Sequence, residues 1–293
     1  MSNPPRIQEP EPIADTRCQT GEGPLWRPDE RHVYWVDIPA GHLFRYDPAT
    51  GTHERVLATE AIGGLTVQED GSLLLLMARG AVRTWRDGKL TTVVEEIPEV
   101  QDSRFNDVIA DPAGRVFGGT MPTDTHPGYL YRVESDGSYV KVLDGLGVPN
   151  GMGFTPDLRG MYFTDSTART IYLFDYDQTT GNLTNQRIFV QTPDDGSVPD
   201  GMTVDADGYV WSARWDGSAL YRYAPNGDEV LRIPFPAKKV SSAIFGGPDY
   251  DELYVTTAGG QDRATEGAGA GALFRLDPGV AGRPEFRSRV RTS

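Results

Sequence analysis

The sequence predicts an all-β protein, a six-bladed β-propeller made of four-stranded antiparallel blades. One sequence pattern recurs six times at intervals of 40 to 50 residues, which is the length of a four-stranded propeller blade. Within each copy, short runs alternate apolar and polar residues, as half-buried strands do. No stretch shows a sustained helical period bounded by capping residues, so two-domain and α/β folds are disfavoured.

The first run of each blade has a polar or small residue, then Gly or apolar residues, then a turn rich in Pro, Asp and Gly. The six copies start near residues 22, 62, 106, 150, 200 and 242. A second apolar run follows each turn, at 33–37, 73–78, 115–120, 161–165, 209–214 and 253–258. Asp-Gly, Asn-Gly and Asp-Pro turns between runs favour hairpins.

A third run follows in each copy, at 42–51, 81–89, 128–137, 170–181, 218–227 and 271–279, and four of these runs alternate with a two-residue period. A more polar fourth run, such as 54–59, 141–145 or 229–235, is expected to form the outer strand of its blade. The pattern therefore predicts one domain over residues 1–293, with residues 1–6 as a flexible tail. A strand over 7–14 is expected to complete the last blade, and 286–290 is the competing candidate, because an open sheet edge invites association. The Gly-rich segment 261–272 is expected to be a mobile loop in that blade.

The charge of the chain excludes several classes of partner. Twenty-eight Lys and Arg residues against 42 Asp and Glu give a net charge of −14. A field of this sign repels nucleic acids and anionic membranes. The longest apolar run, 73–78, is far too short to span a bilayer, and the N-terminus has no export signal. With Cys18 as the single cysteine, no internal disulfide can form, and a cytoplasmic location is expected.

The repeat also locates a candidate site, because the innermost strands of a propeller begin at one mouth of its central channel. The leading residues of the six copies are Glu22, Ile62, Asn106, Asn150, Asp200 and Ser242. Four of them carry a carboxylate or a carboxamide, which favours a cation site over a polar plug of the channel. Glu22, Asn150 and Asp200 offer oxygen ligands suited to Ca²⁺, Mg²⁺ or Mn²⁺. The four histidines occupy unrelated repeat positions, which argues against a closed structural zinc site.

Two further residues lie close to this mouth in the predicted fold. Arg104 precedes Asn106 by two residues, so in an extended segment both side chains point to the same side. A guanidinium there can hold a substrate oxygen, and the alternative is an ion pair with Asp102 or Asp107. Asp124 follows the second strand of the same blade and can reach over the mouth, or it is an ordinary loop residue.

The motifs around these residues resemble those of the senescence marker protein/gluconolactonase/luciferin-regenerating family, which includes regucalcin. They are Gly-Glu-Gly-Pro at 21–24, Arg-Phe-Asn-Asp at 104–107, Pro-Asn-Gly at 149–151 and Pro-Asp-Gly-Met at 199–202. The resemblance extends over about residues 15 to 280 and implies the same six-bladed propeller.

The resemblance also implies roles for individual residues. Glu22, Asn150 and Asp200 match the family's ligands of one divalent cation, whose identity (Ca²⁺, Mg²⁺, Mn²⁺, Fe²⁺ or Zn²⁺) stays open. Arg104 and Asn106 match residues that contact substrate. Asp124, which follows Gly-Thr-Met at 119–121, is the candidate for the acidic substrate contact and is a shorter acid than some members carry.

The implied activity is hydrolysis of a sugar lactone, an aldonolactone, in sugar oxidation. In this chemistry the cation polarises the lactone carbonyl or acidifies a water, and Asp200 is the general base. Two alternatives remain at this stage: hydrolysis of phosphotriesters by the same set of ligands, and a calcium-binding propeller without enzymatic activity. The sequence leaves open which sugar lactone is used, and the oligomeric state.

Overall fold

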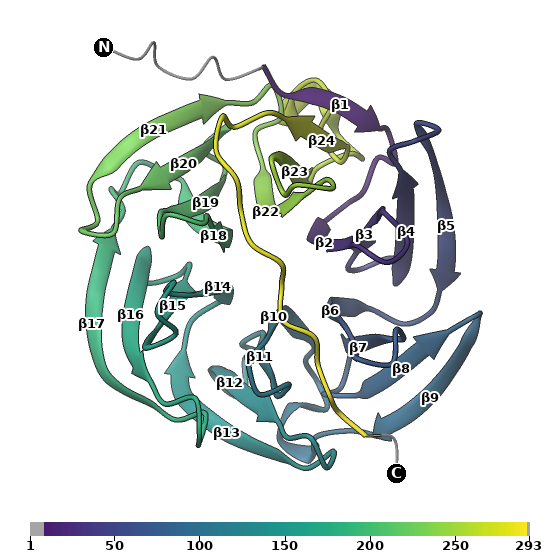
Figure 1. Cartoon of the computed structure of the whole chain (residues 1–293), viewed down its shortest axis with the longest axis vertical. Coiled ribbons are helices and arrows are strands. Elements are labelled where there is room, and N and C mark those ends of the chain that lie inside the picture. Colours follow the sequence, from purple (N-terminus) through teal and green to yellow (C-terminus); the bar gives the residue numbers. More distant parts are fainter. Residues whose placement is uncertain (1–8, 292–293) are drawn as a thin grey trace.

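The computed structural model describes residues 9–291 and contains six four-stranded antiparallel sheets arranged in a ring (Figure 1). The six-bladed propeller predicted from the repeat is confirmed. The first strands of the blades begin at Gly21, Ile62, Phe105, Pro149, Val198 and Val240, each within two residues of the predicted start. In five of the blades, the four strands follow one another in chain order.

These five blades account for most of the chain, and their strands have the following bounds. Blade 1 contains β2 (Gly21–Arg27), β3 (His32–Asp37), β4 (His42–Asp47) and β5 (Thr52–Ala58). Blade 2 contains β6 (Ile62–Val67), β7 (Leu73–Met77), β8 (Val82–Arg86) and β9 (Lys89–Val94). Blade 3 contains β10 (Phe105–Ala110), β11 (Val116–Thr120), β12 (Gly128–Val133) and β13 (Tyr139–Leu146). Blade 4 contains β14 (Pro149–Phe154), β15 (Gly160–Asp165), β16 (Thr170–Tyr176) and β17 (Leu183–Gln191). Blade 5 contains β18 (Val198–Val204), β19 (Val210–Trp215), β20 (Ala219–Tyr223) and β21 (Glu229–Pro234).

Blade 6 combines the two ends of the chain. It contains β22 (Val240–Gly246), β23 (Glu252–Thr257) and β24 (Leu273–Leu276), and its outer strand is β1 (Glu11–Ala14). The pairing of Glu11 with Arg275 and of Ala14 with Leu273 shows that the N-terminal strand closes the ring. The N-terminal candidate for closure is therefore confirmed within the described residues, while positions 1–8, including the expected tail, lie outside them.

The C-terminal segment does not join a blade. Residues 277–291 run across the ring, and Figure 1 shows them as a yellow coil over the central channel. Backbone hydrogen bonds attach this segment to four blades in turn: Gly282 N to Tyr250 O, Ala206 N to Ala281 O, Ser288 N to Val67 O, and Arg289 N to Gly114 O. The alternative prediction that 286–290 completes the last blade is therefore wrong.

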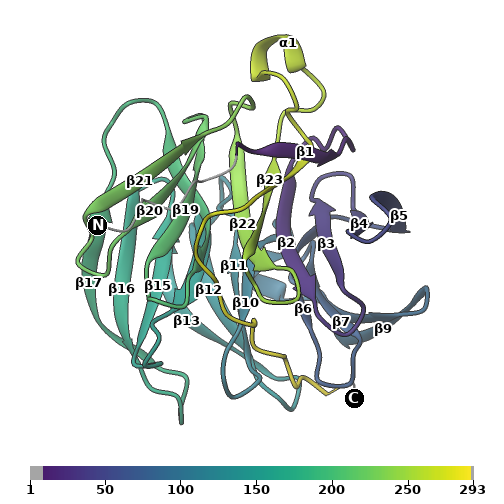
Figure 2. The same ribbon diagram turned by 45° about the horizontal axis from the view of Figure 1, so that its top comes forward.

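Two short helical elements interrupt the strands, η1 (Pro98–Val100) and α1 (Arg263–Glu266). Helix α1 rises from the end of the ring opposite the C-terminus (Figure 2). It lies within 261–272, the segment predicted to be a mobile loop. Lys239 pairs with Glu266 and Arg263 pairs with Asp15, so ion pairs hold this loop against the rest of the propeller.

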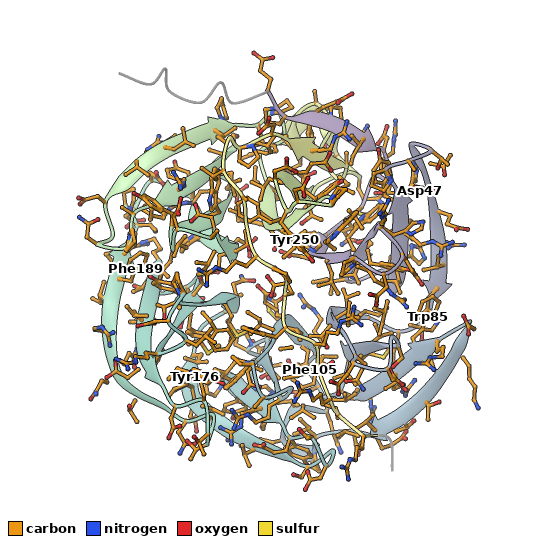
Figure 3. The ribbon with its side chains drawn as sticks, viewed as in Figure 1. Asp47, Trp85, Phe105, Tyr176, Phe189 and Tyr250 are labelled. Carbon is orange, nitrogen blue, oxygen red and sulfur yellow. The ribbon has the colours of Figure 1, made fainter. Side chains whose placement is uncertain are left out.

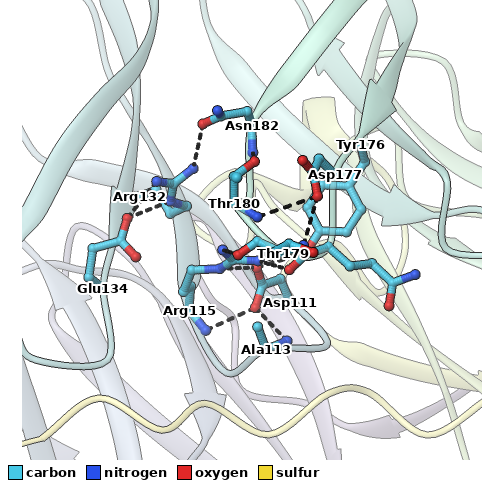
Figure 4. Close-up of polar contacts among 11 residues, drawn as sticks. Asp111, Ala113, Arg115, Arg132, Glu134, Tyr176, Asp177, Thr179, Thr180 and Asn182 are labelled. Atoms are coloured by element: carbon cyan, nitrogen blue, oxygen red, sulfur yellow. Dashed lines mark hydrogen bonds and ion pairs between the residues drawn. The ribbon is translucent and has the colours of Figure 1, made fainter.

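Apolar side chains fill the spaces between the blades (Figure 3). The buried residues form six clusters, and each cluster joins two neighbouring blades. Polar contacts add to this packing, as between blades 3 and 4 (Figure 4). There Arg115 forms a buried ion pair with Asp111 at 2.6 Å and donates to Gln178 O at 2.7 Å in the neighbouring blade. Such packing holds the inner strands at fixed distances around the channel.

Candidate metal and substrate site

The candidate site lies where the inner strands begin, at one mouth of the channel. Glu22 is in β2, Asn106 in β10, Asn150 in β14 and Asp200 in β18, and all four side chains are buried. The structure thus places these predicted residues at equivalent positions of four blades.

A β-bulge lies at or directly after each of these positions. The pairing register shifts between Glu22 and Leu25, between Asn150 and Met152, and between Pro199 and Met202. A bulge inserts one extra residue and turns the preceding side chain relative to the regular ladder. Gly151 and Gly201, which follow Asn150 and Asp200, allow the inner strands to approach closely. A Cβ on Gly151 would lie 2.6 Å from Asp200 O, and one on Gly201 would lie 2.2 Å from Ser242 Oγ.

A chain of hydrogen bonds crosses three blades through the site. Arg104 Nη1 donates to Asn106 Oδ1 at 2.7 Å, and Asn106 Nδ2 donates to Asn150 Oδ1 at 2.8 Å. Asn150 Nδ2 donates to Ser166 Oγ at 2.8 Å, and Ser166 Oγ donates to Pro199 O at 2.6 Å, directly before Asp200. Because both amide hydrogens of Asn106 and the Nδ2 of Asn150 are engaged, each carboxamide has one defined orientation.

The electrostatics of the site are dominated by carboxylates. Burial, with the charge of Asp107, raises the pKa of Glu22 to about 8. Burial and the charge of Glu22 hold the pKa of Asp200 well above its usual range. Arg104 lies close enough to lower both values, and its own pKa is lowered by burial. The single positive charge of Arg104 does not neutralise the carboxylates of Glu22, Asp107 and Asp200. Burying an unpaired charge costs free energy.

This imbalance fits a bound divalent cation. Glu22 and Asp200 supply carboxylate oxygens, and Asn150 Oδ1, which accepts one hydrogen bond, keeps a second lone pair. Over residues 9–291, no three His, Cys, Asp or Glu side chains converge as a metal site. The candidate oxygen set is two carboxylates and a carboxamide. Such a set suits hard cations.

The predicted substrate residues Arg104 and Asp124 differ in their exposure to solvent. Arg104 is half-buried beside Asn106, and neither Asp102 nor Asp107 forms an ion pair with it among the described contacts. Asp102 instead accepts hydrogen bonds from Thr125 and contacts His126 at 3.1 Å, which ties the β11–β12 loop to the start of blade 3. Asp124 is exposed on this loop.

Sequence reasoning missed three polar residues around the channel. Ser166 directly follows β15, the second strand of blade 4. In blade 3 the segment after the second strand, β11, was already considered because it contains Asp124. The same comparison between repeats could therefore have identified Ser166. Asp107 appeared only as a partner for Arg104, although burial raises its pKa to about 6. Glu285 belongs to no repeat and faces a channel cavity of about 50 Å³ that Asp107 also lines.

Two of the predicted leading residues are wrong by one position. In blade 2 the equivalent of Asn150 is Gly63 rather than Ile62, and in blade 6 it is Ser241 rather than Ser242, as the pairing of each inner strand shows. The extra residue of the bulge causes the error, because the repeat pattern does not show on which side of it a residue falls.

Cys18, the single cysteine of the sequence, is buried. Burial raises the pKa of its thiol to about 12. A nucleophilic cysteine needs a thiolate, so Cys18 is not suited to covalent catalysis.

Comparison with known proteins identifies the family. Residues 20–259 match the family described as SMP-30/Gluconolactonase/LRE-like region. The chain belongs to this family. No helix within residues 9–291 has the length and apolar character needed to cross a bilayer.

Several family members are similar over nearly their whole length. Pentonolactonase XacC of Haloferax volcanii is 52% identical over 95% of this chain and 98% of its own. Regucalcin of Gallus gallus is 32% identical, over 94% of this chain and 96% of its own.

Solved structures of family members have the same architecture. A luciferin-regenerating enzyme superposes with a TM-score of 0.89 at 26% identity, covering 97% of this chain and 100% of its own. A calcium-binding regucalcin from Agrobacterium tumefaciens also gives a TM-score of 0.89, at 27% identity over 97% of this chain and 98% of its own. The family assigned from the motifs is confirmed.

Proposed function

We propose that this protein is a sugar lactonase that hydrolyses an aldonolactone to the aldonic acid with the help of one divalent cation. The observation that carries this proposal is the convergence of Glu22, Asn150 and Asp200 beside Arg104 in a buried channel mouth. The 52% identity to a protein named pentonolactonase supports a five-carbon sugar lactone as the substrate.

Glu22, Asn150 and Asp200 would hold the cation. When bound, a divalent cation supplies Lewis acidity that favours negative charge on the lactone carbonyl oxygen. Its identity is proposed as Ca²⁺, Mg²⁺, Mn²⁺, Fe²⁺ or Zn²⁺, and the similarity to a calcium-binding regucalcin supports Ca²⁺ as the first choice.

Asp200 would act as the general base. It takes a proton from the attacking water as the water oxygen bonds to the lactone carbonyl carbon. The bond from that carbon to the ring oxygen then breaks, and the proton returns to the ring oxygen as it leaves. No covalent intermediate with the enzyme is required.

Arg104, Asn106 and Asp124 would bind the sugar. Among the described residues, Arg104 forms hydrogen bonds through Nη1, to Phe105 O and Asn106 Oδ1, so Nη2 is available to a hydroxyl or the carbonyl oxygen. Asn106 Oδ1 has a second lone pair for a hydroxyl. Asp124, exposed on the loop beside this mouth, would accept a hydrogen bond from a more distant hydroxyl.

Hydrolysis of a lactone panel tests the proposal. Chelated protein receives Ca²⁺, Mg²⁺, Mn²⁺, Fe²⁺ or Zn²⁺ individually, and proton release from pentono- and hexonolactones is compared with the spontaneous rate. Asp200→Asn is the matched control, because it preserves the shape of the side chain and removes the base. Metal-dependent turnover lost in the variant supports the lactonase. Turnover of phosphotriesters alone, or metal binding with no turnover, would favour the alternatives.

A further inference from the structure

In blades 3 and 6 the leading side chain is directed at the next blade in the ring. Ser241 Oγ in blade 6 donates to Gly21 O in blade 1 at 2.6 Å. Asn106 Nδ2 in blade 3 donates to Pro149 O in blade 4 at 2.9 Å. In blade 2 the same direction is blocked: a Cβ on Gly63 would lie 2.2 Å from Phe105 O in blade 3.

Between blades 4 and 5 the same contact is made through one additional residue. Asn150 Nδ2 reaches Ser166 Oγ, which donates to Pro199 O in blade 5. Ser166 is 5% exposed and Ser241 is fully buried, so water does not replace these hydroxyls readily.

The three carbonyls that accept these bonds have one feature in common. Gly21, Pro149 and Pro199 each directly precede a candidate metal ligand, namely Glu22, Asn150 and Asp200. A peptide unit is planar, so holding the carbonyl oxygen of one residue also restrains the position of the next Cα, from which the ligand side chain projects.

The bulges lie directly beside these peptides. The strand ladder is interrupted directly after Glu22 and Asn150 and after Pro199. The residues on both sides of the first two peptides are still paired, so the ladder restrains these peptides only up to the point where it breaks. A side-chain donor from the neighbouring blade supplies a further constraint.

We propose that Ser166 and Ser241 are positioning residues of the metal site, which with Asn106 hold the peptide before each ligand and so set the spacing of Glu22, Asn150 and Asp200. This inference rests on the proposed metal site. It also makes ligand spacing a property of the contacts between blades, since each ligand is held by the blade before it.

Metal affinity measured on the metal-free protein tests this inference independently of activity. Mn²⁺ alone is titrated into wild type, Ser166→Ala and Ser241→Ala, and free Mn²⁺ is followed by electron paramagnetic resonance. We expect each variant to bind Mn²⁺ about 10- to 100-fold more weakly, as is typical when the hydrogen-bond partner of a ligand is removed. Because the two serines support different ligands, the double variant is expected to show about the product of the two factors.

Ser212→Ala is the matched control. Ser212 is as buried as Ser241, but its hydroxyl contacts only the adjacent Ala213 O, at 3.3 Å, among the described residues. Thermal unfolding of all variants without metal reports any general loss of stability. An affinity of Ser166→Ala and Ser241→Ala equal to that of wild type would overturn the inference, as would an equal loss in Ser212→Ala. If wild type and Asp200→Asn bind Mn²⁺ equally, the proposed metal site itself is wrong.

Discussion

Glu285 offers a direct test of the electrostatics inside the channel. The residue lies on the C-terminal segment and faces the cavity that Asp107 also lines. Burial, with the charge of Asp107, raises the pKa of Glu285 from 4.5 to about 7. Since the folded protein has the higher pKa, the carboxyl binds its proton more tightly when folded. This contribution to stability is complete below pH 4.5 and is lost as the pH rises through 7.

The size of the effect follows from these two values. Each pKa unit is worth about 1.4 kcal/mol, so ionising Glu285 in the fold costs about 3 kcal/mol by pH 8. The side chain is half-buried, and partial exposure to solvent weakens the effect of its charge, so we expect about 1–2 kcal/mol. Glu285→Gln cannot ionise, and the variant should exceed wild type in free energy of unfolding by that amount at pH 8. At pH 5 the two proteins should differ little.

Urea denaturation at pH 5 and pH 8, in chelator and at constant ionic strength, measures this difference. Glu95→Gln is the control, because Glu95 is exposed and its substitution removes the same charge from the acidic chain. A stabilisation of Glu285→Gln that is the same at both pH values, or no larger than that of Glu95→Gln, would refute the reasoning.

Four further changes have defined outcomes. Asp200→Asn should lower metal-dependent kcat by about 10²- to 10⁴-fold, because it removes the proposed base. Arg104→Lys should raise KM for the lactone about 10-fold. The planar guanidinium of Arg104 can donate to Asn106 and to the substrate at the same time, and the single ammonium group of a lysine cannot reproduce this arrangement. Chelation should lower Tm more at pH 8 than at pH 5, because the raised pKa values of Glu22 (about 8) and Asp200 let protons replace the cation at low pH. Gly63→Ala should destabilise the fold by about 2–3 kcal/mol, because its Cβ would lie 2.2 Å from the backbone atom Phe105 O.

Each of these outcomes has a clear contrary result. Near wild-type kcat in Asp200→Asn would remove it as the base, and an unchanged KM in Arg104→Lys would exclude a substrate contact. A chelation effect on Tm, measured by calorimetry, that is larger at pH 5 would reverse the inferred proton–metal competition. For Gly63→Ala the comparison in denaturation is Gly51→Ala, where a Cβ meets nothing within 4 Å and only the positive φ of 69° costs about 1 kcal/mol. Equal losses in the two would contradict the close approach.

The bulges show where prediction from the sequence reaches its limit. The repeat located Glu22, Asn106, Asn150 and Asp200 correctly, because each lies in a motif of its own. It misplaced the leading residues of blades 2 and 6 by one position. A bulge changes the face on which a side chain lies without changing the alternation that precedes it.

The sequence by itself determined the number of blades, the order of their strands and the candidate ligands, because a repeated pattern of local alternation and turns specifies each blade separately. Only the tertiary structure decided which terminal segment closes the ring, since both ends offered an extended run of similar character. Ring closure also brought Ser241 against Gly21 and placed Glu285 at the cavity beside Asp107. These contacts join residues more than a hundred positions apart, and they arise from the packing of whole blades around one channel, which no local pattern encodes.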